Sequence, residues 1–131
     1  MLYLDSSAIV KLVSREPETD DLVQLIGEDS VTISSELSVV EVLRAVRRVR
    51  GDGRRAEAVL GGVALVPVDA GIIRSAAELS PAALRSLDAI HLATVLSLVG
   101  DVSRLVTYDT RLAAAARSMK VSVSSPGAEG S

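Results

Sequence analysis

Short apolar runs alternate along the chain with longer stretches in which apolar residues recur at helical spacing. The short runs are rich in Val, Leu and Ile and show no polar alternation, which is typical of strands buried on both faces of a sheet. The pattern predicts five strands: Leu2–Leu4, Val31–Ile33, Ala64–Val66, Leu105–Thr107 and Val121–Val123.

Helical patterns fill the intervals between these runs. Because strands alternate with helices, we expect parallel βαβ units in a three-layer α/β/α fold with a mostly parallel central sheet of about five short strands. We predict a single domain over residues 1–123 and a disordered tail over residues 124–131. The expected helices are Ser7–Ser14, Glu18–Ile26, Glu36–Arg50, Arg54–Leu60, Asp69–Leu79, Leu84–Val99 and Thr110–Met119.

The composition narrows the class of protein. A chain of 131 residues with 48% hydrophobic and 24% charged residues has the size and balance of one globular domain. The absence of Cys excludes disulfides and thiolate metal sites, and it fits a reducing cytoplasm. No cationic leader precedes the first apolar run. The most apolar stretch, Leu87–Val99, is too short to span a bilayer, so we expect a cytoplasmic protein without a membrane segment.

Charge is distributed unevenly. The net charge of −3 argues against a protein that coats nucleic acid generally, yet six arginines lie within the twelve residues 44–55. Arg44 and Arg48 are candidates for binding RNA phosphate, and a solvated helix end is the alternative. Tyr3 and Tyr108 are the only aromatic residues, which excludes a base-stacking platform.

Acidic residues follow two of the predicted strands. Asp5 comes directly after the first, and Asp109 lies two residues beyond the fourth. In parallel sheets the functional cleft lies at the carboxyl ends of the strands, so both acids are expected at one edge. Each is equally a favoured N-cap for the helix that follows. Capping alone therefore remains an alternative for either residue.

Two further acids lie within helices. Asp88 begins the apolar stripe of its helix, and a buried carboxylate needs a partner or a metal ion. A salt bridge to Arg85 is the alternative. Glu41 lies mid-helix, where position alone favours a surface ion pair with Arg44 or Arg48. Carboxylates gathered together would repel unless a hard cation such as Mg²⁺ or Mn²⁺ joined them, and a chain without Cys and with one His does not suit zinc.

Four segments carry a resemblance to a known family: LDSSAIVKL, SSELSVVEVLRAVRR, LRSLDAIHLAT and LVTYDTRLAAAA. In this order and at these separations they resemble the PIN-domain ribonucleases, and more narrowly the VapC-like toxins of bacterial toxin–antitoxin pairs. The resemblance extends from Met1 to about Pro126.

The resemblance implies an endoribonuclease that depends on Mg²⁺ or Mn²⁺, forms homodimers and is inhibited by a small cognate antitoxin. Only the resemblance makes Glu41 a candidate ligand. It implies Asp5, Glu41, Asp88 and Asp109 as the catalytic, metal-binding acids, with Ser7 and Thr107 beside them.

Other functions are possible for the same sequence. A PIN-fold binding module could act through an antitoxin as a corepressor with little nuclease activity, although the four acids disfavour this. A phosphoaspartate receiver is disfavoured because Pro67 follows the third predicted strand, and a haloacid-dehalogenase-type phosphatase because Ser7 replaces its second Asp. His91 is either a packed core residue or a general base.

Overall fold

One parallel sheet organises the molecule. The structure, a computed structural model, describes residues 1–28 and 31–128. Within them the strand order is β3-β2-β1-β4-β5, and every neighbouring pair is parallel. The strand β1 therefore lies in the centre, between strands that come later in the chain. The strands are β1 (Leu2–Leu4), β2 (Thr32–Ser35), β3 (Ala64–Val66), β4 (Arg104–Val106) and β5 (Val123–Ser124).

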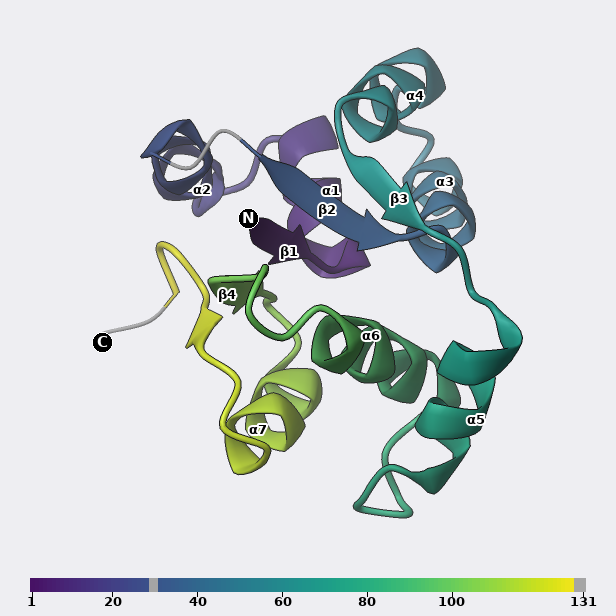
Figure 1. Cartoon of the computed structure of the whole chain (residues 1–131). Coiled ribbons are helices and arrows are strands. Elements are labelled where there is room, and N and C mark those ends of the chain that lie inside the picture. The colour runs from purple at the N-terminus through teal and green to yellow at the C-terminus, as the bar shows by residue number, and fades with distance from the viewer. Residues whose placement is uncertain (29–30, 129–131) are drawn as a thin grey trace.

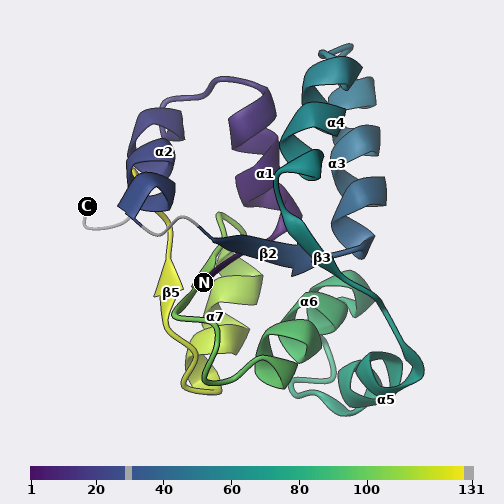
Figure 2. The same cartoon turned by 45° about the horizontal axis from the view of Figure 1, so that its top comes forward.

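Helices cover both faces of this sheet (Figures 1 and 2). Four lie on one face and three on the other, which confirms the predicted three-layer α/β/α architecture. Among the described helices, none is long and apolar enough to cross a membrane. The first face carries α1 (Ser6–Val13), α2 (Thr19–Glu28), α3 (Leu37–Arg48) and α4 (Gly53–Gly61), and the second α5 (Ala70–Glu78), α6 (Ser86–Ser97) and α7 (Thr110–Ser118).

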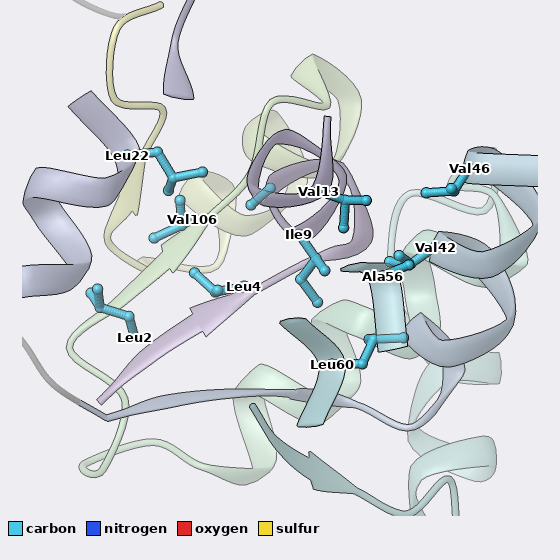
Figure 3. Packing of buried hydrophobic residues seen from close by; sticks show 11 residues of the cluster. Leu2, Leu4, Ile9, Val13, Leu22, Val42, Val46, Ala56, Leu60 and Val106 are labelled. Atoms are coloured by element: carbon cyan, nitrogen blue, oxygen red, sulfur yellow. The ribbon is translucent and has the colours of Figure 1, made fainter. Parts of the chain in front are cut away.

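Alternation along β1 divides the core into two clusters. Leu2 and Leu4 face the first layer of helices, in a cluster that also contains Ile9 of α1 and Val42 of α3 (Figure 3). Tyr3 faces the opposite layer, in the cluster of α6 and α7. Successive side chains of a strand point to opposite faces, so β1 contributes to both clusters. The phenol of Tyr3 is thereby directed toward α6.

The ordered chain extends past the predicted domain boundary at residue 123. Ser124 belongs to β5 and is buried, and the backbone N–H of Thr107 donates to its carbonyl over 3.2 Å. The hydroxyl of Ser125 donates to the carbonyl of Thr107 over 2.6 Å, and the phenol of Tyr108 donates to the carbonyl of Pro126 over 2.7 Å. The expectation of disorder is therefore wrong for residues 124–126, because β5 pairs with β4 and two side-chain hydrogen bonds hold the residues that follow it. Residues 129–131 lie outside the described residues.

Candidate active site

Asp5 ends β1 and caps α1. Its Oδ1 accepts hydrogen bonds from the backbone N–H of Ala8 over 3.0 Å and from the hydroxyl of Ser7 over 2.6 Å. Its Oδ2 accepts from the hydroxyl of Thr107 over 2.5 Å. The residue is only 3% exposed. Burial raises the pKa of the Asp5 carboxyl above its usual range, although hydrogen bonds from Ser7 and Thr107 oppose the shift.

Asp109 likewise follows a strand, β4, and caps the next helix, α7. Its Oδ1 caps the helix by accepting from the backbone N–H groups of Arg111, over 2.9 Å, and Leu112, over 3.2 Å. Its Oδ2 accepts from the Arg85 guanidinium over 2.8 Å. Both strand-end acids therefore cap the helices that follow them, and the second oxygen of each faces another polar group.

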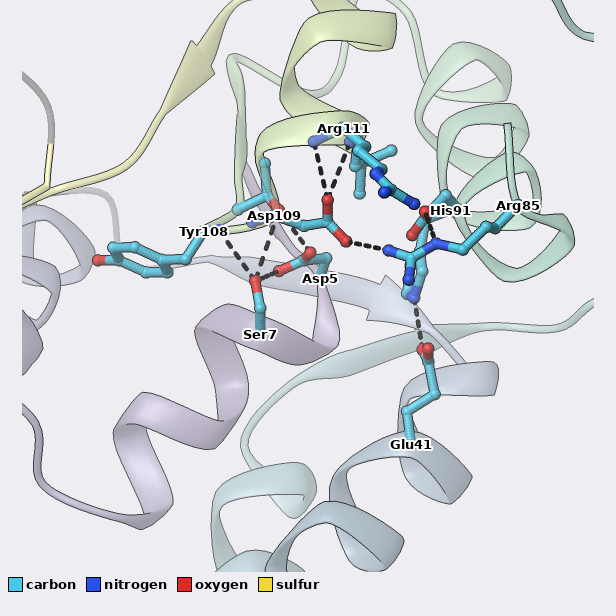
Figure 4. A network of polar contacts seen from close by, with 11 residues as sticks. Asp5, Ser7, Glu41, Arg85, His91, Tyr108, Asp109 and Arg111 are labelled. Carbon is cyan, nitrogen blue, oxygen red and sulfur yellow. Dashed lines mark hydrogen bonds and ion pairs between the residues drawn. The ribbon is translucent and has the colours of Figure 1, made fainter. Parts of the chain in front are cut away.

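Two hydroxyls join the strand-end acids into one network (Figure 4). The hydroxyl of Thr107, which donates to Asp5, also accepts from the backbone N–H of Asp109 over 3.0 Å. The hydroxyl of Ser7 accepts from the backbone N–H of Tyr108 over 2.9 Å. Both hydroxyls donate to Asp5, and they connect the ends of β1 and β4 to each other.

Asp88 is buried, at 8% exposure, and it forms the salt bridge to Arg85 that the sequence offered as an alternative to a metal ion. Arg85, three residues earlier, donates to it from Nε over 3.1 Å while donating to Asp109 from Nη2. The hydrogen bond to Asp88, together with the charges of Asp88 and Asp109, raises the pKa of Arg85. One guanidinium therefore joins two carboxylates from different helices, and its side chain remains 58% exposed.

Glu41 is held by a residue whose role the sequence left ambiguous. Its Oε1 lies 2.6 Å from Nε2 of His91, and Nδ1 of His91 lies 2.8 Å from the phenol oxygen of Tyr3. The expected ion pair with Arg44 or Arg48 is replaced by this contact. Sequence reasoning missed Tyr3, and the available signal was its place between two leucines on a buried strand.

A groove of about 650 Å³ opens beside Glu41, the one of the four acids that lines it. Its walls include Ser7, Glu41 and Tyr108, together with the exposed Arg44 and Arg48 of α3. A second hollow along α3 is lined by Arg44, Arg47 and Arg48. The groove thus brings cationic side chains next to acidic ones, an arrangement suited to an anionic polymer that approaches a cation-binding centre.

The four predicted acids surround one region without forming a closed ligand cage. In residues 1–28 and 31–128, no three acidic or histidine side chains come close enough together to hold one metal ion. The physical reason is that Asp88 and Asp109 are turned to Arg85, and Glu41 to His91. The donor set still fits a hard divalent cation, because it consists of carboxylates and the Asp88–Asp109 pair already binds a cationic group.

Comparison with known proteins connects this geometry to a family. A model of the PIN domain matches residues 2–118. Ribonuclease VapC46 of Mycobacterium tuberculosis is 45% identical over 129 residues, which cover 95% of this chain and 97% of that protein.

Solved structures show the same fold. VapC20 of Mycobacterium tuberculosis, described as a sarcin–ricin loop cleaving toxin, superimposes with a TM-score of 0.69 at 17% identity, covering 88% of this chain and 95% of that one. A toxin–antitoxin complex from Klebsiella pneumoniae gives a TM-score of 0.68 at 19% identity, with coverage of 84% and 88%. At these identities the likeness concerns the fold alone.

Proposed function

The chain belongs to the PIN domain family, and from that premise we propose that it is an endoribonuclease that cleaves RNA with Mg²⁺ or Mn²⁺ bound by Asp5, Glu41, Asp88 and Asp109. Its relative in Mycobacterium tuberculosis, similar over nearly the full length of both chains, is a ribonuclease. RNA hydrolysis is therefore the activity that the relatives support, and dependence on a divalent ion is the finer part of the proposal.

One observation carries the metal site: Asp88 and Asp109 share a single cationic group at the carboxyl edge of the sheet. Asp5 lies at the same edge and is linked to Asp109 through Thr107. Arg85 is a replaceable cation, because its side chain is 58% exposed and can turn toward solvent. A small divalent ion between these carboxylates would then neutralise more charge than the guanidinium does.

The protein's own groups would orient the reactants. A bound divalent cation activates water and neutralises the charge that develops on the phosphate. The helix caps of Asp5 and Asp109 fix one oxygen of each carboxylate and leave the other directed inward. No side-chain nucleophile is required, and the hydroxyls of Ser7 and Thr107 are engaged in holding Asp5.

The groove along α3 supplies the place for substrate. Arg44 and Arg48 lie on its wall with Glu41, so a phosphodiester bound to the two arginines would extend toward the acids. Such contacts to phosphate carry no sequence information and position the strand. We assign Arg44 and Arg48 to RNA binding on this basis.

A small antitoxin and a second copy of the chain complete the proposal. The family resemblance implies both, and one structural relative is a toxin–antitoxin complex. The competing function is a binding module that acts through an antitoxin with little cleavage of its own. The two differ in whether the antitoxin-free protein cuts RNA.

The deciding experiment is RNA cleavage by purified, antitoxin-free protein with Mg²⁺ or Mn²⁺ and with EDTA. We expect cleavage with either ion and none with EDTA. Asp88→Asn should lower the rate by about a thousandfold, because a metal contributes several kcal/mol and each 1.4 kcal/mol is tenfold in rate. Equal cleavage by the wild-type and Asp88→Asn proteins would refute the metal-carboxylate mechanism.

A binding control separates the groove from the acids. Asp88→Asn should keep its affinity for RNA, since the arginines are unchanged. Arg44→Ala/Arg48→Ala should bind RNA more weakly. The slope of log K against log salt concentration should become shallower by about 0.7 for each lost phosphate contact to a single strand. Arg74→Ala/Arg117→Ala, which removes two exposed arginines from α5 and α7 in the opposite helix layer, serves as the charge-matched control.

A further inference from the structure

His91 lies almost fully buried beside the acids. Its ring is 2% exposed, and both of its nitrogens are in hydrogen-bond distance of a partner. Nδ1 faces the Tyr3 phenol from the central strand, and Nε2 faces the Glu41 carboxylate from α3. Three elements from opposite layers of the fold therefore meet at this one ring.

The partners determine which nitrogen carries the proton. A carboxylate can only accept, so Nε2 must be the donor to Glu41, and the neutral ring then has Nδ1 as its acceptor. Tyr3 is fully buried, and its phenol O–H lies 2.8 Å from Nδ1 and can donate to it. The bonds run in one direction, from Tyr3 through His91 to Glu41.

Glu41 depends on this bond more than the other acids depend on theirs. Asp5 and Asp109 are fixed by backbone N–H groups of the helices that they cap. Glu41 projects from the middle of α3, where such groups are already used, and its side chain is 21% exposed. A long flexible side chain loses rotamer freedom when it is ordered, and an external donor must supply that ordering.

We propose that His91, with its proton placed by Tyr3, is a positioning residue that holds the Glu41 carboxylate ready to bind the divalent ion. This inference rests on the proposed function, since it assumes that Glu41 is a metal ligand. It also assigns His91 a role other than general base, because neither ring nitrogen is left to receive a proton from water. Outer groups that orient metal ligands in this way commonly govern metal affinity.

The test measures Mn²⁺ binding to the RNA-free protein by titration calorimetry, so it requires no cleavage. His91→Leu should weaken Mn²⁺ binding by about 10- to 100-fold. His91→Gln should restore most of the affinity, since its amide can donate to Glu41 from nearly the position of Nε2. Tyr3→Phe keeps the ring packing and removes the donor to Nδ1, so it should weaken binding by several-fold.

A double-mutant cycle distinguishes positioning from a general structural role. If His91 acts through Glu41, then His91→Leu should weaken Mn²⁺ binding no further in a Glu41→Gln background. Melting curves establish that each variant is folded. If His91→Leu is unfolded, the Mn²⁺ affinity of His91→Gln is compared with the affinities of Tyr3→Phe and Glu41→Gln to test the positioning role.

The possible failures are separable. Weaker Mn²⁺ binding by Glu41→Gln, with unchanged binding by His91→Leu and Tyr3→Phe, would overturn the positioning role and leave the proposed function intact. Fully additive effects, with His91→Leu and Glu41→Gln each weakening binding independently of the other, would also overturn it. Unchanged Mn²⁺ binding by both Glu41→Gln and Asp88→Asn would overturn the metal site itself.

Discussion

The four acids Asp5, Asp109, Asp88 and Glu41, called here the acid centre, fall into two halves that are held in different ways. On the strand side, Asp5 and Asp109 are oriented by helix caps and by the hydroxyl of Thr107, all within a few residues of a strand end. On the helix side, Asp88 and Glu41 are oriented by basic side chains, Arg85 and His91. The strand side is thus fixed by backbone geometry, whereas the helix side depends on side chains that could turn elsewhere. The first half is preorganised and the second is adjustable.

Replacing Asp5 tests the strand side and should give the largest effect. Asp5→Asn should lower RNA cleavage by about a thousandfold, by the same reasoning as for Asp88. The metal-free variant should nevertheless melt at a higher temperature than wild type. The pKa of Asp5 is higher in the folded protein than in the unfolded chain. The free energy of unfolding of the wild type therefore falls as pH rises above the ordinary Asp pKa of about 4.

The measurement is thermal unfolding in EDTA from pH 3 to pH 8. The stability advantage of Asp5→Asn should grow as pH rises from about 4 through the raised pKa of folded Asp5, and should then level off. Added Mn²⁺ should reverse the order, because a ligand that binds only the folded wild type stabilises it by mass action. A variant less stable than wild type in EDTA at pH 8 would mean that the buried carboxylate is not a source of strain.

Removing the hydroxyl of Thr107 tests whether the strand side is rigid without its central link. Thr107→Val should lower cleavage by about 10- to 100-fold, as expected for loss of a group that orients a ligand. It should also reduce the free energy of unfolding by about 1–3 kcal/mol, since a buried carboxylate oxygen loses its donor. Thr32→Val, at a hydroxyl that makes only a 3.5 Å contact with Gly62, is the matched control. Equal RNA cleavage and equal stability of Thr107→Val and Thr32→Val would show that the Thr107 hydroxyl does not hold Asp5.

Replacing Arg85 tests the helix side and should give the smallest effect. Arg85→Ala should change the melting temperature of the metal-free protein only slightly, because the guanidinium is 58% exposed and water can take its place beside Asp88 and Asp109. Mn²⁺ should bind the variant more tightly, since no guanidinium then competes for Asp88 and Asp109. Calorimetry with Arg117→Ala as the control measures this. Weaker Mn²⁺ binding would instead make Arg85 a helper of the metal site.

The same division explains what the sequence could predict. Asp5 and Asp109 were found from local rules, because strand ends and helix caps depend on neighbouring residues. The Arg85–Asp88 pair also follows from helical spacing. The bonds from His91 to Glu41 and from Arg85 to Asp109 join residues 50 and 24 positions apart, and no local pattern encodes them. The fold was predicted well for a related reason, since five buried apolar runs determine a sheet, whereas the last strand was misplaced because Ser124 is polar.

The central position of β1 has a consequence for how the protein is made. Leu2 of β1 pairs with Thr32 of β2 on one side and with Arg104 of β4 on the other. Although β1 leaves the ribosome first, its second neighbour emerges about 100 residues later, and pairing over such a separation is slow. Asp109 follows β4 still later in synthesis. A nascent chain therefore carries an incomplete set of the four acids until Asp109 has left the ribosome.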